Sequence, residues 1–167
     1  MQLHLQDENR TLELGSLLAG ILRQYGPCAV LFQGPLGSGK TTLVRGLVGH
    51  YPGGAQAEVN SPSFNLANIY PTSPEIIHLD LYRIQAGESD ECVEEYLDLP
   101  ARQILMEWSE HLPEAAYPEH YLLIGLDYQG SSRKAAIRAY GASAEQILAR
   151  LRDRCRGRWG AASKPDA

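Results

Sequence analysis

The stretch Gly34–Thr41 has the residue types and spacing needed to bind a phosphate chain. It reads Gly-Pro-Leu-Gly-Ser-Gly-Lys-Thr and matches the pattern G-x-x-x-x-G-K-[ST] at every fixed position. Glycines let backbone N–H groups approach phosphate oxygens without interference from a Cβ atom. Lys40 is expected to reach the β- and γ-phosphates, and the Thr41 hydroxyl is expected to bind Mg²⁺. The sequence therefore predicts a nucleoside-triphosphate site formed by Gly37, Ser38, Gly39, Lys40, Thr41 and Thr42.

The segments on either side of this loop support that prediction. Residues 28–33 form a short apolar run typical of a buried strand, and residues 42–48 begin an amphipathic helix. A helix that starts directly behind the loop points its N-terminus, with roughly half a positive charge, at the same phosphates. The alternative is an ordinary glycine-rich turn, and the strand–loop–helix order argues against it. Pro35 lacks an N–H, but its position is variable in the pattern, so binding is expected to survive.

Two carboxylates follow apolar runs that have the character of strands. Asp80 lies at the end of residues 76–81, and Glu107 lies at the end of residues 103–108. In open α/β sheets, ligands bind beyond the carboxyl ends of the strands, so both residues are expected beside the phosphate loop. Asp80 is then placed like the carboxylate that helps to hold Mg²⁺ in phosphate-loop enzymes. The alternatives are a turn cap for Asp80 and a solvent-exposed side chain for Glu107, and Trp108 is interpreted as a packing residue.

Apolar periodicity and turn residues divide the remaining chain into short elements. Residues 3–5 suggest an edge strand, and a helix begins at Asp7 or Thr11 and is stopped by Gly26-Pro27. Residues 64–79 are expected to form a β-hairpin after the phosphate-loop helix. The later elements are an acidic helix over 88–97 with Cys92, Val93 and Tyr96 inside, strands over 103–108, 120–128 and 134–140, and a helix from Ala144 to about Leu151 capped by Ser143.

Length, charge and cysteine content restrict the class of protein. A chain of 167 residues suggests one domain, and a net charge of −5 gives no general basic coat for nucleic acid. No apolar run approaches the length of a membrane span, and the first residues lack the pattern of a signal peptide. The three cysteines are far apart and form neither a metal pair nor a disulfide framework. A cytoplasmic location is therefore expected, without a membrane partner.

The end of the chain differs from the rest in composition. Six of the fifteen basic residues lie in the last 18 positions, among glycine, alanine, serine and proline. The sequence thus predicts a phosphate-loop ATPase domain over 1–151 and a basic, disordered tail over 152–167. A solvated ending is one interpretation of this tail, and contact with an RNA backbone is the other. The six residues are Arg150, Arg152, Arg154, Arg156, Arg158 and Lys164.

Five motifs in order resemble the TsaE family of bacterial ATPases. They are Gly34-x-Leu-Gly-x-Gly-Lys-Thr-Thr42, Ser61-Pro-Ser-Phe64, His78-x-Asp-x-Tyr-Arg83, Val93-Glu-Glu-Tyr96 and Glu107-Trp108. The resemblance implies an α/β fold, a phosphate-loop three-layer sandwich with a central mixed sheet and the inserted β-hairpin. It also implies binding of ATP and Mg²⁺ and a role in forming threonylcarbamoyladenosine, beside the anticodon of tRNAs that read codons beginning with A. Proteins of this family bind the TsaB–TsaD complex, and ATP hydrolysis is thought to reset it.

The resemblance also implies roles for individual residues. Thr41 and Glu107 are similar to Mg²⁺ ligands, and Asp80 resembles the residue that orients water or metal, so Asp80 and Glu107 are the expected catalytic pair. Arg133 is similar to a family ATP contact, and Glu8 is expected near the adenine. Residues that match a nucleotide-responsive loop are Ser61 and Ser63. Departures from the usual family residues are Pro35 for Asp, Ser38 for Ala and Ser63 for Thr.

Other classes of nucleotide-binding protein remain as rivals. A small-molecule kinase could use Asp80 as a base, but it would need an acceptor pocket and an arginine-bearing lid, and the sequence indicates no internal lid. A GTPase is disfavoured because the guanine-reading motif N-K-x-D is absent from the sequence. A non-hydrolysing nucleotide-binding module is disfavoured by the two carboxylates.

Overall fold

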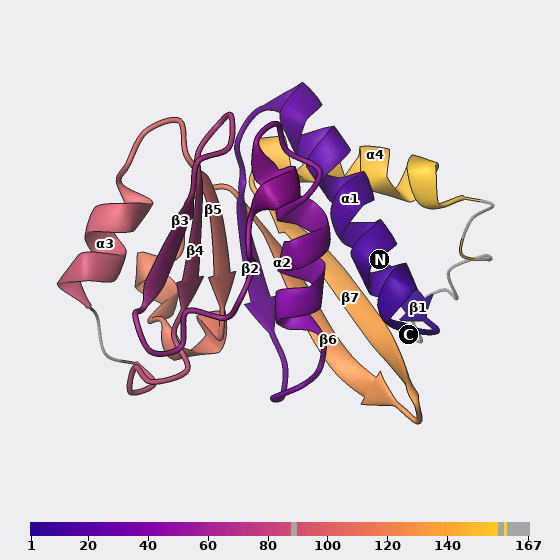
Figure 1. The fold of residues 1–167 in the computed structure, drawn as a ribbon, viewed down its shortest axis with the longest axis horizontal. Coiled ribbons are helices and arrows are strands. Elements are labelled where there is room, and N and C mark those ends of the chain that lie inside the picture. The colour runs from indigo at the N-terminus through magenta and orange to yellow at the C-terminus, as the bar shows by residue number, and fades with distance from the viewer. Residues whose placement is uncertain (88–89, 157–158, 160–167) are drawn as a thin grey trace.

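A computed structural model describes residues 1–87, 90–156 and 159. Its strands form one mixed sheet in the order β1-β7-β6-β2-β5-β4-β3 (Figure 1). Strands β4, β5, β2 and β6 run parallel, whereas β1, β7 and β3 pair antiparallel with their neighbours. The mixed sheet of an α/β fold is therefore confirmed. The strand bounds are β1 (Gln2–Leu5), β2 (Ala29–Gln33), β3 (Ala67–Tyr70), β4 (Ile76–Asp80), β5 (Gln103–Glu107), β6 (Tyr121–Gln129) and β7 (Ser132–Tyr140).

The two faces of the sheet are covered unequally. Successive side chains of a strand point to opposite faces. Val30 and Phe32 of β2 pack in the core beneath α1, α2 and α4, whereas Leu31 packs in the smaller core beside α3 and the 3₁₀ turns of residues 109–111 and 114–116. The result is the expected three-layer arrangement (Figure 1). The helix bounds are α1 (Glu8–Tyr25), α2 (Lys40–Val48), α3 (Glu91–Leu97) and α4 (Ala142–Cys155), with a further 3₁₀ turn at Gly54–Gln56.

Helices α1 and α2 pack closely through glycines. Asp7 caps the start of α1 by accepting a hydrogen bond from the Arg10 N–H at 2.9 Å, and Gly26, with φ 98°, ends it as expected. A Cβ atom at Gly15 would collide with the carbonyl oxygen of Leu43, and one at Gly46 would collide with that of Leu12. Because α2 begins directly behind the phosphate loop, this contact fixes the loop relative to α1.

The hairpin and the acidic helix differ from their expected bounds. Strand β3 begins at Ala67, because Leu66 adopts φ 64° and cannot continue an extended strand. Phe64, expected in the strand, is instead 82% exposed in the preceding loop. Helix α3 begins at Glu91 behind an Asp90 cap, and Glu88 lies outside the described residues. The expectation that Cys92 faces inward is wrong: Cys92 is exposed, and Val93 is the buried residue of this short helix.

Helix α4 is longer than expected at both ends. It starts at Ala142 after Gly141, whose conformation at φ 81° replaces the predicted serine cap. It ends at Cys155, four residues beyond Leu151, because Cys155 lies one turn further along the same buried face. Residues 152–155 are therefore helical, contrary to the disordered tail that was expected to begin there. Arg158 and Lys164 lie outside the described residues, so the rest of that prediction is untested.

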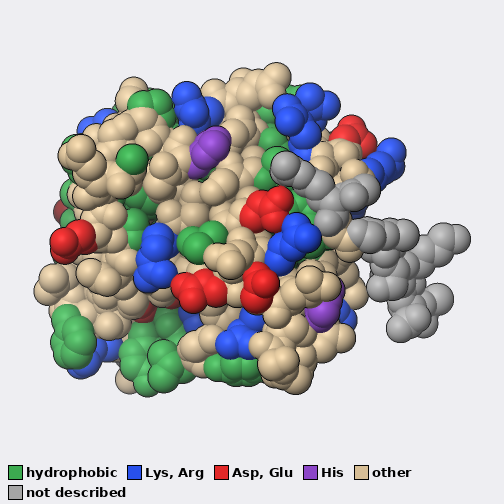
Figure 2. Space-filling view, turned by 45° about the vertical axis from the view of Figure 1, so that its right-hand side comes forward, with side chains coloured by type: hydrophobic (Ala, Val, Ile, Leu, Met, Phe, Trp, Pro, Cys, Tyr) green, Lys and Arg blue, Asp and Glu red, His purple; other side chains and the backbone are tan. Residues whose placement is uncertain are grey.

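In the part of the chain that the structure describes, no helix is long and apolar enough to cross a membrane. On the face shown in Figure 2, acidic and basic side chains lie interspersed and do not separate by sign.

Candidate nucleotide-binding site

The phosphate loop lies where the carboxyl ends of β2, β5 and β4 meet. In the parallel register, Phe32 of β2 is opposite Glu107 of β5, and Glu107 is opposite Asp80 of β4. This alignment brings the two predicted carboxylates side by side at the start of α2. The sheet thus places them beside the loop, as the strand-end argument expects.

The loop backbone has a conformation that suits the close approach of an anion. Gly34, Gly37 and Gly39 have φ values of 134°, 76° and 105°, which residues with a Cβ rarely adopt. Helix α2 begins at Lys40, two residues earlier than expected, and its cap Gly39 offers no side-chain hydrogen bond. Within the described residues, the first N–H groups of α2 therefore have no side-chain cap and are suited to bind phosphate oxygens.

Ser38 contributes to this loop through its backbone. The residue is completely buried, and its hydroxyl has no hydrogen-bond partner within the described part of the chain. Its N–H donates to the carbonyl of Pro35 at 3.2 Å. Because the protein encloses this side chain completely, the hydroxyl is not placed to select a ligand.

Lys40 is held inside the loop by neutral hydrogen-bond partners. Its Nζ donates to the carbonyl oxygens of Gly34 at 2.7 Å and Pro35 at 3.0 Å. The same nitrogen lies 3.9 Å from the ring centroid of Trp108. Burial lowers the pKa of Lys40, and the charges of Glu107, Glu110 and Asp80 oppose that effect. The interpretation of Trp108 as a packing residue was incomplete, because its ring also supports the lysine.

The oxygen ligands expected for Mg²⁺ lie together on one side of the loop. The Thr41 hydroxyl donates to Oε1 of Glu107 at 2.8 Å and lies 3.1 Å from Oε2. Asp80 and Glu107 are 3% and 2% exposed, so each needs such partners. Oδ1 of Asp80 accepts from the Tyr82 N–H at 2.9 Å, and Oδ2 accepts from the Ser61 hydroxyl. These side chains line a cavity of about 250 Å³ formed by Leu36, Gly37, Gly39, Lys40, Thr41, Thr42, Ser61, Ser63, Asp80, Tyr82, Glu107 and Trp108.

The donor set fits a magnesium ion that arrives with a phosphate chain. Among the described residues, no group of three or more His, Cys, Asp or Glu side chains could hold a metal ion. Mg²⁺ usually binds one or two protein carboxylates and takes its other oxygen ligands from water and substrate phosphates. Thr41, Glu107 and Asp80 offer this kind of partial oxygen shell beside the loop.

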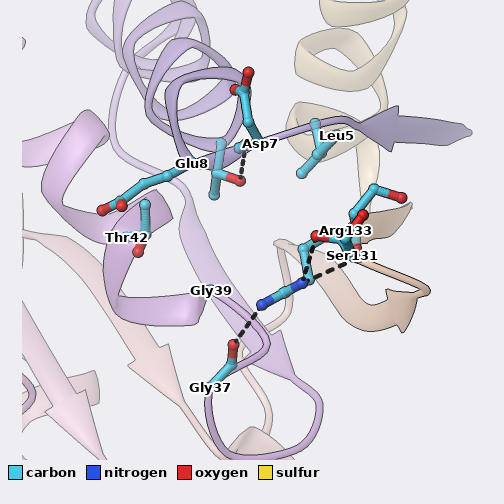
Figure 3. A pocket seen from close by; sticks show the side chains of 10 residues that line it. Leu5, Asp7, Glu8, Gly37, Gly39, Thr42, Ser131 and Arg133 are labelled. Atoms are coloured by element: carbon cyan, nitrogen blue, oxygen red, sulfur yellow. Dashed lines mark hydrogen bonds between the residues drawn. The ribbon is translucent and has the colours of Figure 1, made fainter.

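A second cavity of about 280 Å³ lies on the other side of the loop (Figure 3). Asp7 and Glu8 line it from the start of α1, and Arg133 lines it from β7. The Arg133 Nη2 donates to the carbonyl of Gly37 at 3.3 Å, and Glu8 pairs with Arg45 at 3.4 Å. Because Gly37, Gly39 and Thr42 line both cavities, the second one continues from the phosphate loop. Its position and size suit the ribose and base of a nucleotide.

Tyr128 belongs to this site although its sequence signal is weak. Its hydroxyl donates to the carbonyl of Leu36 at 2.6 Å, and the Arg133 guanidinium lies 4.5 Å from its ring centroid. The end of β6 and the start of β7 therefore contact the loop at Leu36 and Gly37. The aromatic residue before a turn gives no local sign of this contact, because Leu36 lies 92 positions earlier.

The mixed sheet, the strand–loop–helix unit and the strand-end carboxylates together define a P-loop nucleotide-binding protein. The crystal structure of Bacillus subtilis YdiB has the same fold, with a TM-score of 0.72 over 92% of this chain and 95% of that one at 22% sequence identity.

Sequence comparisons identify the family within this class. The family described as "Threonylcarbamoyl adenosine biosynthesis protein TsaE" matches residues 5–136. The TsaE protein of Nostoc is 34% identical over 89% of this chain and 91% of its own length. The TsaE protein of Haemophilus influenzae is 33% identical over 78% of this chain and 84% of its own length. The TsaE protein of Streptomyces coelicolor is 39% identical over 59% of this chain and 66% of its own length. The chain belongs to the TsaE family of tRNA threonylcarbamoyladenosine biosynthesis.

Proposed function

We propose that this protein is a Mg²⁺-dependent ATPase that serves the formation of threonylcarbamoyladenosine on tRNA. The observation that carries the proposal is the Thr41 hydroxyl bound to the Glu107 carboxylate at 2.8 Å, with Asp80 opposite Glu107 in the sheet. A metal held there would neutralise charge on the terminal phosphates, and Asp80 would orient the attacking water or the metal.

The two cavities suggest how one nucleotide is placed. The cavity with Lys40, Thr41 and Glu107 is suited to the terminal phosphates, and the cavity with Glu8 and Arg133 is suited to the nucleoside. A carboxylate can accept a hydrogen bond from the exocyclic amine of adenine. Glu8 near the base would therefore provide one polar contact to ATP.

The proposed partner is the TsaB–TsaD complex, with tRNA contacted indirectly. The curated relatives carry the description "tRNA threonylcarbamoyladenosine biosynthesis protein TsaE", which supports a role in this tRNA modification. Hydrolysis would reset the partner complex and would not transfer the threonylcarbamoyl group. The basic residues near the end of the chain would contribute to contact with RNA by neutralising phosphates.

The test is the rate of ATP hydrolysis measured with and without TsaB–TsaD. We expect low hydrolysis by the isolated protein and clear stimulation by the complex, with Mg²⁺ required in both cases. Phosphate release without phosphorylation of any small molecule separates an ATPase from a small-molecule kinase. Hydrolysis unaffected by TsaB–TsaD, or phosphate transfer to a small-molecule acceptor, would contradict the proposal.

A further inference from the structure

A chain of buried polar groups continues behind Glu107, away from the cavity. The imidazole Nε2 of His78 lies 3.0 Å from Oε1 of Glu107, and its Nδ1 lies 3.3 Å from the hydroxyl of Tyr70. His78 is completely buried and Tyr70 is 5% exposed. The order of contacts is therefore Tyr70, His78, Glu107 and Thr41, from the edge strand β3 to the first turn of α2.

The sheet explains why these groups meet. His78 and Asp80 are two residues apart on β4, so their side chains share the face of the sheet that α2 covers. His78 is opposite Leu105 in the register, and Glu107 is the next residue of β5 on that face. His78 thus lies one step deeper in the sheet than Asp80. The cavity with Thr41 and Glu107 is not lined by His78, so the histidine reaches that site only through Glu107.

The hydrogen-bond chemistry assigns a direction to the chain. A Glu107 carboxylate that binds a cation must be ionised and can only accept hydrogen bonds, so Nε2 of His78 carries the hydrogen. Nδ1 of a neutral imidazole is then an acceptor, and the Tyr70 hydroxyl donates to it. Burial is the main factor that raises the pKa of Tyr70, which keeps this phenol protonated. Each donor in the chain therefore faces an acceptor: the Tyr70 hydroxyl faces His78, and both the His78 N–H and the Thr41 hydroxyl face Glu107.

We propose that His78 is a positioning residue that orients the Glu107 carboxylate for Mg²⁺. The inference rests on the proposed Mg²⁺-ATP site. By donating to Oε1 from behind, His78 restricts rotation of the carboxylate and keeps it beside the Thr41 hydroxyl. Groups that orient a metal ligand in this way typically contribute 10–100-fold to metal affinity.

The experiment compares substitutions that keep or remove the donated N–H. Gln can place an amide N–H near the position of Nε2, whereas Leu fills similar space without a donor and Asn reaches only the position of Nδ1. Mn²⁺ affinity is measured by electron paramagnetic resonance with a non-hydrolysable ATP analogue bound. The affinity for that analogue is measured separately in EDTA. Thermal unfolding verifies that every variant is folded, and His50→Gln at an exposed histidine is the control.

We expect His78→Leu and His78→Asn to weaken Mn²⁺ binding roughly 10–100-fold, and His78→Gln to stay within about threefold of the wild type. Tyr70→Phe should have a smaller effect, because it removes only the donor to Nδ1. Analogue binding in EDTA should remain unchanged in all of them. Folded His78→Leu with wild-type Mn²⁺ affinity, or equal losses in the Leu and Gln variants, would overturn the inference. If the wild type itself bound no Mn²⁺ with the analogue, the proposed function would fail instead.

Discussion

At the level of single residues, Lys40 combines burial with neutral hydrogen-bond partners. Its two carbonyl partners are neutral and its third neighbour is the Trp108 ring. Replacing it by alanine removes the charge-assisted contacts to phosphate, each worth about 1.5–3 kcal/mol. We expect Lys40→Ala to weaken ATP binding by at least roughly 10–100-fold in calorimetric titration. Lys134→Ala, which removes the same charge from an exposed position on β7, should leave binding unchanged.

If Lys40→Ala bound ATP as tightly as the wild type, the assignment of the loop as the nucleotide site would be wrong. A loss of affinity shared by Lys134→Ala would indicate a general charge effect instead, because that substitution changes the net charge equally.

A substitution that preserves the shape of Glu107 can separate its role in metal binding from nucleotide binding. An amide is a poorer Mg²⁺ ligand than a carboxylate. We expect Glu107→Gln to reduce Mg²⁺-dependent hydrolysis by about 100-fold or more, since even indirect partners of metal ligands contribute 10–100-fold. The ATP dissociation constant in EDTA should change only slightly. Normal hydrolysis by this variant, measured as phosphate release, would show that Glu107 does not bind the metal.

The candidate residues differ in how far they could be predicted from sequence. Lys40 and Thr41 follow from a local pattern, because eight consecutive positions determine the loop chemistry. The strand ends also place Asp80 and Glu107, since the ends of short apolar runs indicate where strands stop. Tyr128 could not be identified as a site residue from the sequence. Its contact with the loop depends on the strand order, which places β6 next to β2. The sequence marks His78 only as part of a motif. Nothing in that motif indicates that His78 contacts Tyr70 and Glu107.

At the level of elements, the glycine contact between α1 and α2 positions the loop. A methyl group at Gly46 would press on the backbone of Leu12, which cannot move without shifting α1. Overpacking of this kind usually costs about 1–3 kcal/mol. We expect Gly46→Ala to lower the unfolding free energy by at least that amount and to weaken ATP binding, because α2 begins at Lys40. Chemical denaturation and nucleotide titration measure the two effects.

Gly20→Ala is the matched control on α1. A Cβ there would meet only the His50 ring, at 3.9 Å, so the substitution should stabilise the helix by about 0.5–1 kcal/mol. If Gly46→Ala behaved like Gly20→Ala, the close helix contact would not determine the position of the loop.

Element boundaries were less predictable than the elements themselves. The existence of α1 followed from its apolar periodicity, and its ends followed from Asp7 and Gly26, whose effects are local. The late start of β3 follows from the backbone at Leu66, with φ 64°, which propensity does not reveal. The extension of α4 to Cys155 depends on burial against the core, a tertiary effect.

At the level of the whole molecule, the end of α4 decides how much chain the domain needs. A protein truncated after Leu151 loses Cys155, which is 4% exposed in the main core. We expect it to fold and bind ATP but to lose about 1–3 kcal/mol of stability, because every site residue precedes the cut. A protein ending at Trp159 keeps every described residue and should be as stable as the full chain. Failure of the shorter protein to fold, seen by circular dichroism, would contradict a domain ending at 151.

The same pair of truncations tests a role for the basic residues. If they contact RNA phosphates, the affinity for tRNA-bearing TsaB–TsaD should fall with salt, because bound counterions are released. For the protein ending at Leu151, this affinity should then fall less steeply with salt than for the full chain. The measurement is the affinity of both proteins at two salt concentrations. Equal slopes would leave this end of the chain as a solvated segment.

The register of β4 against β5 limits where this sequence can gain or lose residues. Side chains alternate faces along a strand, so inserting one residue between Ile76 and Asp80 would exchange the faces of His78 and Leu79. The Asp80 carboxylate would then enter the apolar core that now contains Leu79, and Leu79 would face the nucleotide. An insertion of two residues would restore the face but displace Asp80 by roughly 6–7 Å along the sheet. Length variation among relatives should therefore fall in the turn of residues 71–75 and be excluded from residues 76–80.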